Sequence, residues 1–459
     1  MHFAQIYTPE LAHCSYVIGK NQKCVVVDPS RDVEKYFKQA DAFGMEIVGV
    51  LITHLHADFV SGHLELANKA NATIYAPAAA NCEFSYHPLK DSEEFTVENL
   101  CFKLTETPGH TPDSSFVTVF DLERGKDPIL AFTGDTLLVG DVGRPDLFPD
   151  KEEELAEELF ESLKKFDELP DSCEIYPAHG MGSLCGRSLS AKLSSTMGTE
   201  RKYNYALQYD ELENFKEDLL AEMPPAPDHF SRCSEINRKG PVLMDDLDQP
   251  KPMDPNEVNN AIQEGKIVLD TRSFVSFAAA HIPKSYSITK SGNLSKFAGW
   301  IIPPDDEIIL VMDHEKDLED VKNSLYHVGL DNIVGYLKGG IEGWINSGFL
   351  IDYIESMSVK RLYEWLEEDH PLVIDNRSSD EWETGYVPGS KLAPAPDVRF
   401  LYEEWSSEKP VVTICNTSKR SMLAASILKQ KGFKRVINVM GGMTAWKNAG
   451  YPLQFRAEE

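Results

Sequence analysis

Short apolar, β-rich runs alternate with helical periodicity through the first half of the chain. The strand-like runs include residues 24–30, 48–54, 72–77 and 128–135, and the helix-like stretches include 60–70 and 151–166. Apolar runs of about four to eight residues predict strands, and apolar residues repeating every three or four positions predict helices. The mixture predicts an α/β domain over residues 1–222.

Residues 223–252 interrupt this pattern. They are rich in proline and charged residues and show little periodicity. Such a composition is typical of a linker that lies over a surface.

The second half of the chain repeats one pattern twice. Each copy opens with an apolar strand that leads into Asp-x-Arg-Ser, and each closes with a Gly-Gly pair and a Trp. The matching residues are Asp270, Arg272, Gly339, Gly340 and Trp344 in the first copy, and Asp375, Arg377, Gly441, Gly442 and Trp446 in the second. We therefore predict two similar α/β domains, at residues 253–352 and 357–459.

Length and composition fit about three globular units without a membrane segment. The chain has 459 residues, 42% of them hydrophobic and 26% charged, and no run of about 18 apolar residues that would cross a bilayer. Its 45 basic and 74 acidic residues leave a net charge of −29, which repels a phosphate backbone. We expect neither a membrane nor a nucleic acid as a partner.

The cysteines and the first residues indicate the compartment. The eight cysteines are scattered without a C-x-x-C pair, which favours reduced thiols. The first 19 residues lack the basic and apolar regions of a signal peptide. We expect a cytoplasmic protein.

Histidine and aspartate side chains follow four predicted strands. These residues are His54, His56 and Asp58 after the first strand, His110 after the second, Asp135 after the third and His179 after the fourth. One histidine at a strand end is usually structural, but four such segments in succession favour a metal site.

The T-H-x-H-x-D, G-H-T and G-D segments resemble the metallo-β-lactamase superfamily over roughly residues 1–220, including its glyoxalase II and persulfide dioxygenase branches. The resemblance implies an αββα sandwich. Two-metal members have a second-metal histidine where this chain has Phe59, which cannot ligate. His63 lies four residues further on and is placed in the following helix. We therefore expect one metal ion.

Resemblance to persulfide dioxygenases implies one Fe(II) per chain, bound by His54, His110 and Asp135. Two imidazoles and a carboxylate suit non-haem iron and leave positions for water, a persulfide and O2. His56, Asp58 and His179 would hold the ligands and water in place. The expected products are sulfite and the parent thiol.

Two further residues near this site have open roles. Arg144 belongs to a G-R-x-D segment that resembles one beside the iron of persulfide dioxygenases, and it either binds the substrate carboxylate or braces its own loop. Cys185 follows His179 closely, and a sulfur relay through it is one alternative to a buried structural thiol.

In the second copy, an apolar strand leads into a loop from Cys415 to Arg420, and we expect a helix from Ser421. Backbone N–H groups of Asn416, Thr417, Ser418 and Lys419, the helix N-terminus and the charge of Arg420 would stabilise a thiolate or a persulfide. Cys415 is therefore predicted to be a nucleophile.

The C-x-x-x-x-R-S loop, D-x-R-S and G-G-M-x-A-W resemble rhodanese sulfurtransferases over residues 357–455. The resemblance implies that Cys415 and Arg420 are catalytic and that the loop binds the sulfur substrate. Related phosphatases have a loop longer by one residue, so the shorter loop favours sulfur. Counting back 102 residues, the separation of Gly441 from Gly339, places Asp313 at the position of Cys415 and Leu318 at that of Arg420. The first copy is therefore predicted to be inactive.

The whole layout resembles bacterial persulfide dioxygenase-sulfurtransferase fusions. It implies oxidation of a small thiol persulfide with O2 to sulfite, coupled to sulfur transfer and thiosulfate formation through Cys415. Two alternatives remain: a zinc thioester hydrolase of the glyoxalase II kind fused to a rhodanese, and a non-catalytic sulfur-binding or regulatory protein. The thiol carrier stays open, and a homo-oligomer is expected.

Overall fold

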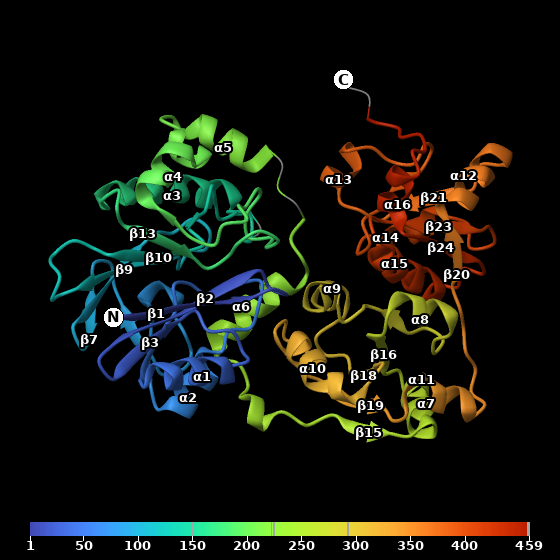
Figure 1. Cartoon of the computed structure of the whole chain (residues 1–459), viewed down its shortest axis with the longest axis horizontal. Helices are drawn as coiled ribbons and strands as arrows, with labels where there is room; N and C mark the ends of the chain where they lie inside the picture. The colour runs from blue at the N-terminus through green and yellow to red at the C-terminus, as the bar shows by residue number, and fades with distance from the viewer. Residues whose placement is uncertain (149, 222, 224, 292, 457–459) are drawn as a thin grey trace. The chain divides into compact units, whose positions relative to one another are not determined.

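The computed structural model describes residues 1–148, 150–221, 223, 225–291 and 293–456. It contains two compact units, the first formed by Met1–Leu247 with Tyr326–Gly329, and the second by the remainder from Asp248 onward. Figure 1 labels the helices and strands along the chain.

The first unit contains two six-stranded sheets. The first sheet has the order β1 (His2–Thr8), β2 (His13–Lys20), β3 (Lys23–Val27), β4 (Glu46–Leu51), β5 (Thr73–Pro77) and β6 (His87–Leu89). The second has the order β14 (Ser195–Thr196), β13 (Glu174–Pro177), β10 (Leu130–Gly134), β9 (Ser115–Asp121), β8 (Leu100–Glu106) and β7 (Glu94–Val97). Strands β11 (Leu137–Leu138) and β12 (Asp141–Val142) form a separate two-stranded antiparallel sheet.

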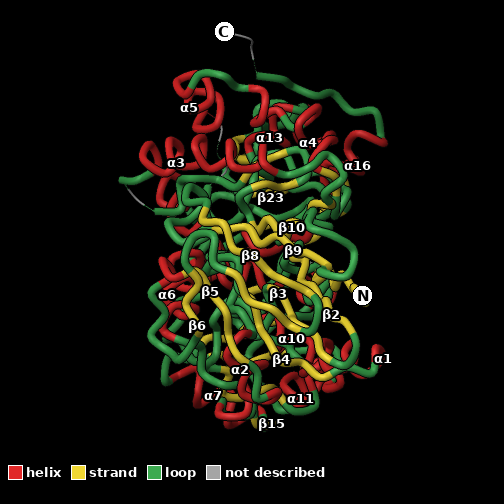
Figure 2. Tube along the Cα trace, turned by 90° about the vertical axis from the view of Figure 1, so that its left-hand side faces the viewer, coloured by secondary structure: helices red, strands yellow, loops and turns green. Residues whose placement is uncertain are grey.

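Helices cover the outer faces of both sheets. They are α1 (Glu34–Phe43) and α2 (His63–Ala70) on the first sheet, and α3 (Glu152–Lys164), α4 (Met197–Tyr203) and α5 (Leu212–Ala221) on the second (Figures 1 and 2). Alternation along β2 explains the layers, because successive side chains of a strand point to opposite faces. Tyr16 and Ile18 pack between the sheets, whereas Val17 packs under α1 and α2. The predicted αββα sandwich is confirmed.

The carboxyl ends of four strands meet at one edge of this sandwich. Strand β4 runs parallel to β3 and β5, and β10 runs parallel to β13. A backbone hydrogen bond from Ala178 to Gly134 joins the loops after β13 and β10, and His13 forms an isolated bridge with His179. The loops that carry the predicted metal ligands are therefore close together.

The prediction of an aperiodic linker over residues 223–252 is wrong for its middle part. Residues His229–Lys239 form helix α6, whose Phe230 and Cys233 are buried. The side chain of Asn237 donates to the carbonyls of His56 and Phe59, at 2.8 Å each. The proline and charged residues of this segment suggested a linker, and the apolar periodicity of the helix is weak because its buried face is partly polar.

The second unit contains two five-stranded parallel sheets, one for each sequence copy. The first sheet has the order β15 (Lys251–Met253), β19 (Ile333–Leu337), β18 (Ile308–Val311), β16 (Ile267–Asp270) and β17 (Tyr286–Ser287). The second has the order β20 (Glu355–Ser358), β24 (Val436–Met440), β23 (Val411–Ile414), β21 (Leu372–Asp375) and β22 (Lys391–Leu392).

Each of these sheets has its own helices. They are α7 (Pro255–Gln263), α8 (Phe274–Ala279), α9 (Leu294–Ile301), α10 (Leu318–Tyr326) and α11 (Gly340–Asn346) in the first copy, and α12 (Val359–Glu368), α13 (Ser379–Glu383), α14 (Val398–Leu401), α15 (Lys419–Gln430) and α16 (Gly442–Asn448) in the second. The two copies therefore share one strand order and one α/β plan, as the internal repeat predicts.

The Asp-x-Arg pairs of the repeat form buried ion pairs in both copies. Arg377 donates to both carboxylate oxygens of Asp375, at 3.0 and 2.8 Å, and also to the carbonyl of Gly385 at 3.0 Å. Arg272 makes the same bidentate contact with Asp270. These buried ion pairs join the ends of β16 and β21 to the turns that follow them.

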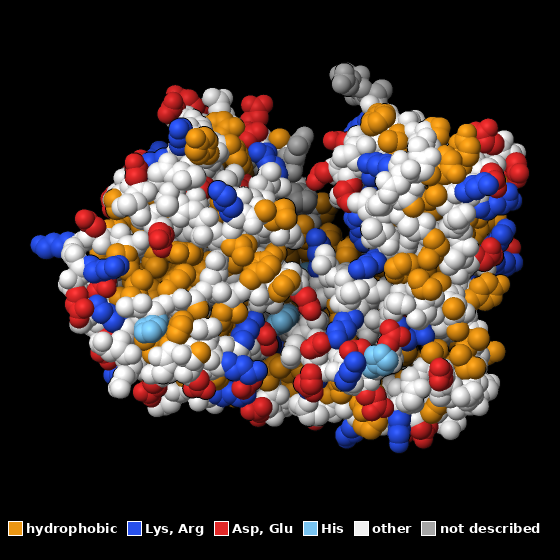
Figure 3. Space-filling view, viewed as in Figure 1, with side chains coloured by type: hydrophobic (Ala, Val, Ile, Leu, Met, Phe, Trp, Pro, Cys, Tyr) orange, Lys and Arg blue, Asp and Glu red, His pale blue; other side chains and the backbone are white. Residues whose placement is uncertain are grey.

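None of the described helices has both the length and the apolar character needed to cross a bilayer. On the face shown in Figure 3, acidic and basic side chains are intermixed with hydrophobic ones.

The tight packing of α16 against the Cys415 loop can be tested at Gly442. This residue has φ +55°, and a Cβ added there would lie 1.9 Å from the Cys415 carbonyl oxygen. We expect Gly442→Ala to lower the free energy of unfolding of this domain by about 2 to 3 kcal/mol. The control is Gly432→Ala, where φ is +86° and no atom lies within 4 Å, with an expected loss of about 1 kcal/mol. Amide hydrogen exchange across α15 measures both losses, and equal exchange rates in the two variants would contradict the packing argument.

Candidate functional site

Three predicted ligand atoms converge at the edge of the sandwich. The Nε2 atoms of His54 and His110 lie 3.6 and 3.4 Å from Oδ2 of Asp135. All three side chains are buried, and neither Nε2 atom has a hydrogen-bond partner within the described part of the chain. Their spacing matches that of ligands of one cation.

Hydrogen bonds fix how the two imidazoles are turned. His110 donates from Nδ1 to the carbonyl of Arg144 at 2.9 Å, which leaves Nε2 with its lone pair. The Thr53 hydroxyl donates to Asp28 at 2.8 Å, so it accepts from Nδ1 of His54 at 3.0 Å. Both rings therefore present a ligating nitrogen to Asp135, as metal-binding histidines require.

A second group, formed by His56, Asp58 and His179, surrounds the first. His179 bridges two carboxylates, with Nδ1 2.8 Å from Asp135 and Nε2 2.9 Å from Asp58. Burial lowers the pKa of His179, but these carboxylates outweigh burial and raise the pKa well above its usual value. Nε2 of His56 lies 3.4 Å from Asp28. His179 thus links Asp58 to Asp135, and the role predicted for these residues in holding metal ligands and water stays a prediction.

The donor set fits a divalent metal ion. Metal–nitrogen and metal–oxygen bonds of about 2.0 to 2.2 Å allow ligand atoms to lie about 3.4 Å apart around one ion. Unpartnered buried nitrogens are costly, and a cation between them and Asp135 would satisfy both. His54, His110 and Asp135 are therefore suitable ligands of one ion, with two histidines and one carboxylate.

Phe59 is fully buried beside this donor set. Its ring centroid lies 4.4 Å from that of His56 and 6.2 Å from that of His179. Phenylalanine offers no ligand atom at this position. His63 lies in α2, as predicted, and its ring contacts Phe84 instead of the donor set.

The sequence analysis missed His13 as a neighbour of the site. His13 is buried at the start of β2, with its ring centroid 4.4 Å from Phe59 and 5.3 Å from both His56 and His179. Neither ring nitrogen has a hydrogen-bond partner among the described residues. Only the strand pairing brings His13 here, and no local motif indicates it.

Asp28 and Asp113 support the 53–59 loop and were also missed. Asp28 accepts from the Thr53 amide and hydroxyl at 2.8 Å each, and Asp113 accepts from the Leu55 amide at 2.8 Å. Asp28 follows β3 directly, so its position at the end of a strand was a usable signal. Asp113 lies just after the G-H-T turn.

The contacts of Arg144 agree with the second of its two predicted roles, bracing of its loop. Its buried guanidinium donates to Asp146 at 2.6 and 2.7 Å and to the Leu184 carbonyl at 3.1 Å. Because its own carbonyl accepts from His110, Arg144 positions a ligand through its backbone. Binding of a substrate carboxylate by this side chain stays a prediction.

Cys185 lies within the same buried region, in a group with Asp135 and His179. Burial, followed by the charge of Asp58, raises the pKa of the Cys185 thiol to about 12. The thiol is therefore protonated at neutral pH in this environment, and a thiol is a weaker nucleophile than a thiolate.

The Cys415 loop forms a compact turn between β23 and α15. The helix begins at Lys419, two residues before the predicted Ser421, because Ser418 adopts a left-handed conformation with φ 71° and ends the turn early. The Ser418 hydroxyl donates to the Val439 carbonyl at 3.0 Å, and the Ser421 hydroxyl donates to Sγ of Cys415 at 3.3 Å. Cys415, the predicted nucleophile, therefore lies close to the N-terminus of α15, and the Ser418 hydroxyl bonds to a backbone carbonyl of the fold.

Glu381 of α13 contacts this loop, and the sequence analysis missed it. Its carboxylate accepts from Arg420 at 2.5 and 2.8 Å and from the side-chain amide of Asn416. Burial raises the pKa of Glu381, but the adjacent Arg420 outweighs burial and lowers it to about 2. Glu381 is thus a permanent anion at the loop, brought from the start of α13.

The first copy has a different residue at the nucleophile position from the one predicted. Val311 and Ile414 end the equivalent strands, so the offset there is 103 residues, and Met312 rather than Asp313 corresponds to Cys415. The single offset failed because the loops of the two copies differ in length. A thioether cannot form a persulfide, so Met312 takes the place of Asp313 in the argument, and the inactivity of the first copy stays a prediction.

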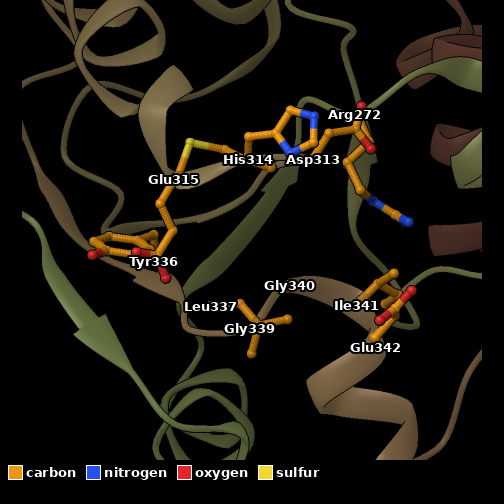
Figure 4. Close-up of a pocket in the computed structure, with 11 residues that line it drawn as sticks. Arg272, Asp313, His314, Glu315, Tyr336, Leu337, Gly339, Gly340, Ile341 and Glu342 are labelled. Carbon is orange, nitrogen blue, oxygen red and sulfur yellow. The ribbon is translucent and has the colours of Figure 1, made fainter.

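A cavity of about 410 Å³ remains at this place in the first copy. Figure 4 shows Arg272, Asp313 and His314 on one side of it, and Ile341 and Glu342 from the start of α11 on the other. With the same offset, Lys316 stands where the second copy has Lys419, and Asp317 stands where it has Arg420. The loop of the first copy therefore has no counterpart of Arg420, the cation expected to bind a sulfur oxyanion in the second copy.

Comparison with known families agrees with this architecture. The model of the metallo-beta-lactamase superfamily matches residues 8–179, and the model of the rhodanese-like domain matches residues 254–347 and 358–449. A solved metallo-beta-lactamase from Staphylococcus aureus subsp. aureus COL is 31% identical, with a TM-score of 0.66, covering 73% of this chain and 98% of that one.

The chain therefore belongs to the metallo-β-lactamase superfamily. It is a member in which this domain is followed by two rhodanese-like domains, and the predicted fusion architecture is confirmed.

Curated relatives of the first domain have two different activities in their names. A hydroxyacylglutathione hydrolase of Pseudoalteromonas translucida is 34% identical over 35% of this chain, and the match covers 57% of that protein. A persulfide dioxygenase, ETHE1, of Bos taurus is 27% identical over 39% of this chain and 68% of that protein. The chain thus spans less than two thirds of the first of these relatives.

Metal content tests the ligand set. We expect His54→Ala, His110→Ala and Asp135→Ala each to reduce bound metal at least tenfold, because each removes one of three protein ligands. His56→Ala should retain most of the metal, since His56 lies outside that set. Elemental analysis of the purified full chain measures the content, with the exposed His87→Ala as the control. Equal losses in His56→Ala and His54→Ala would contradict the proposed set.

A second substitution tests the consequence of Phe59. An imidazole at this position would add a ligand beside Asp58 and His179, so Phe59→His should raise zinc binding from about one to about two ions per chain. Phe59→Tyr should leave the content at one. Titration with zinc, followed by elemental analysis, measures the stoichiometry, and one ion in both variants would show that Phe59 does not limit binding.

Proposed function

We propose that the first domain oxidises a low-molecular-weight thiol persulfide to sulfite with O2 at one non-haem Fe(II). In the overall reaction, a persulfide, O2 and water give the thiol, sulfite and two protons. The sulfane sulfur loses four electrons and O2 gains them. The second rhodanese-like domain would transfer persulfide sulfur through Cys415 to sulfite, giving thiosulfate.

The observation that carries this proposal is the donor set of His54, His110 and Asp135 with Phe59 beside it. The set offers two nitrogens and one carboxylate to one ion, and Phe59 removes the ligand that a second ion would use. Iron bound in this way supplies adjacent positions where a persulfide sulfur and O2 can meet. The resemblance of the first domain to a persulfide dioxygenase also supports this choice.

The residues around the ion would keep its surroundings fixed and dry. The Arg144 carbonyl and the Thr53 hydroxyl orient the two imidazoles, and His179 holds the carboxylate of Asp135. Phe59 and His13 are fully buried on the neighbouring side. The apolar ring of Phe59 would exclude water that competes with O2 or hydrolyses the persulfide.

Sulfur transfer at Cys415 needs no external oxidant or reductant. A thiol persulfide would donate its outer sulfur to the Cys415 thiolate, and the parent thiolate would leave. Sulfite would then attack the outer sulfur of the Cys415 persulfide, so that an S–S bond forms in thiosulfate and the Cys415 thiolate is released. The helix N-terminus and Arg420 would stabilise the anionic sulfur in both steps.

Oxygen consumption and product analysis test the two activities separately. The iron-loaded chain should consume O2 with glutathione persulfide or coenzyme A persulfide, and Asp135→Ala should lower this rate at least a hundredfold. Cys415→Ser should abolish thiosulfate formation while sulfite formation continues, because the metal domain is intact. No O2 uptake with either persulfide would refute the dioxygenase, and equal loss of both products in Cys415→Ser would show that the two sites do not act separately.

A zinc thioester hydrolase is the second candidate. It is favoured by the relatives named hydroxyacylglutathione hydrolase and by His56, whose ring nitrogens lack hydrogen-bond partners among the described residues. In that case a metal-bound hydroxide would attack the carbonyl of a thioester. Two zinc ions per chain, with hydrolysis of a glutathione thioester and no O2 uptake, would establish it in place of the dioxygenase.

A further inference from the structure

The first rhodanese-like domain contacts the Cys415 loop of the second. Nζ of Lys419, which lies in the loop, donates to the carbonyl and hydroxyl oxygens of Ser291 in the first domain, at 2.9 and 3.3 Å. Arg399 of α14 donates to the carbonyl of Trp300 in α9 at 2.6 Å (Figure 1). Side-chain and backbone atoms of the first rhodanese-like domain therefore contact the Cys415 loop and α14 of the second.

Helix α9 places one more cation close to the Cys415 loop. Lys296 lies on α9 and interacts electrostatically with Arg420 and Glu381 of the second domain. Burial first, and Arg420 second, lower the pKa of Lys296 to about 8. In the described part of the chain its ammonium has no hydrogen bond and no carboxylate in ion-pair contact, so it is available to an incoming anion.

The negative charge of Glu381 is the reason why an anionic substrate would need a second cation at this loop. Glu381 already occupies both nitrogens of Arg420 that face it, and it also engages Asn416. An anionic substrate would meet the Glu381 carboxylate at the position where Arg420 is expected to bind it. A second cation beside Arg420 offsets that repulsion, because charges a few ångströms apart in a partly buried site interact strongly.

We propose that Lys296 of the first rhodanese-like domain completes the anion-binding site of Cys415, and that with Arg420 and Lys419 it selects negatively charged sulfur donors and acceptors. The substrate class is a small sulfur oxyanion, such as sulfite, or a persulfide that carries a carboxylate. This inference rests on the proposed sulfur transfer at Cys415, and it gives the first rhodanese-like domain a role as a specificity-determining partner.

Alkylation of Cys415 in the full chain tests this charge selection without any sulfur chemistry. Iodoacetate is anionic and iodoacetamide is neutral, and both form the same thioether bond with release of iodide. Mass spectrometry of the Cys415 peptide gives the two rate constants, with the half-buried Cys82 as an internal reference. Their ratio, iodoacetate over iodoacetamide, measures how much the site favours an anion.

Replacement of the ammonium should change this ratio in a defined direction. Lys296→Met should lower it about fivefold, whereas Lys296→Arg should retain it. Glu381→Gln should raise it, because the competing carboxylate is removed while glutamine can still serve at the third position of α13. Lys266→Met, a matched loss of charge at the start of β16 where Lys266 pairs with Glu307, should leave it unchanged.

The outcomes separate this inference from the function on which it rests. An unchanged ratio in Lys296→Met, or an equal fall in Lys266→Met, would overturn the role of Lys296. Protection gives a second measure: the sulfite concentration that halves the iodoacetamide rate should rise about fivefold in Lys296→Met, and no rise would also overturn it. Uptake of one sulfur atom by Cys415 from a thiol persulfide is measured independently, so its failure would refute sulfur transfer while leaving the anion site intact.

Discussion

The buried carboxylate of Asp135 is the constraint on which the first domain depends. Burial alone would raise its pKa, but His179 and the other imidazoles around it hold the pKa well below its usual range. A charged group without water must be paired or bind a cation. The strand ends that carry His54, His110 and His179 therefore have to meet at Asp135, and the sandwich is the arrangement that brings them there.

Much of this could be predicted from sequence because the signals are local. Strand-end motifs indicated the metal residues, and the repeated Asp-x-Arg and Gly-Gly segments indicated two related domains. His13, Asn237 and Glu381 could not be predicted in the same way, since each reaches its partners only through tertiary packing. Asn237 even lies in a segment whose composition suggested a linker, because its helix buries polar contacts as well as apolar ones.

The first rhodanese-like domain keeps the fold of the second without a cysteine at the position of Cys415. Trp344 and the Asp270–Arg272 pair still support the sheet, but Met312 stands where a thiol would be needed. A fixed sequence offset pointed to the wrong residue because loops change length while strands keep their register. The strand pairing, and not the residue count, identifies equivalent positions.

The negative net charge of the chain explains why cations from two domains would be useful beside Cys415. The chain as a whole has a net charge of −29, which opposes the approach of sulfite or a carboxylated persulfide. Salt screens charges beyond about 8 to 10 Å, so only groups close to the sulfur can reverse this repulsion. Arg420 is paired with Glu381 and Lys419 is held by Ser291. Lys419 keeps its charge beside the neutral Ser291, and Lys296 adds a further cation. In our proposal, the charge around Cys415 therefore depends in part on the first rhodanese-like domain.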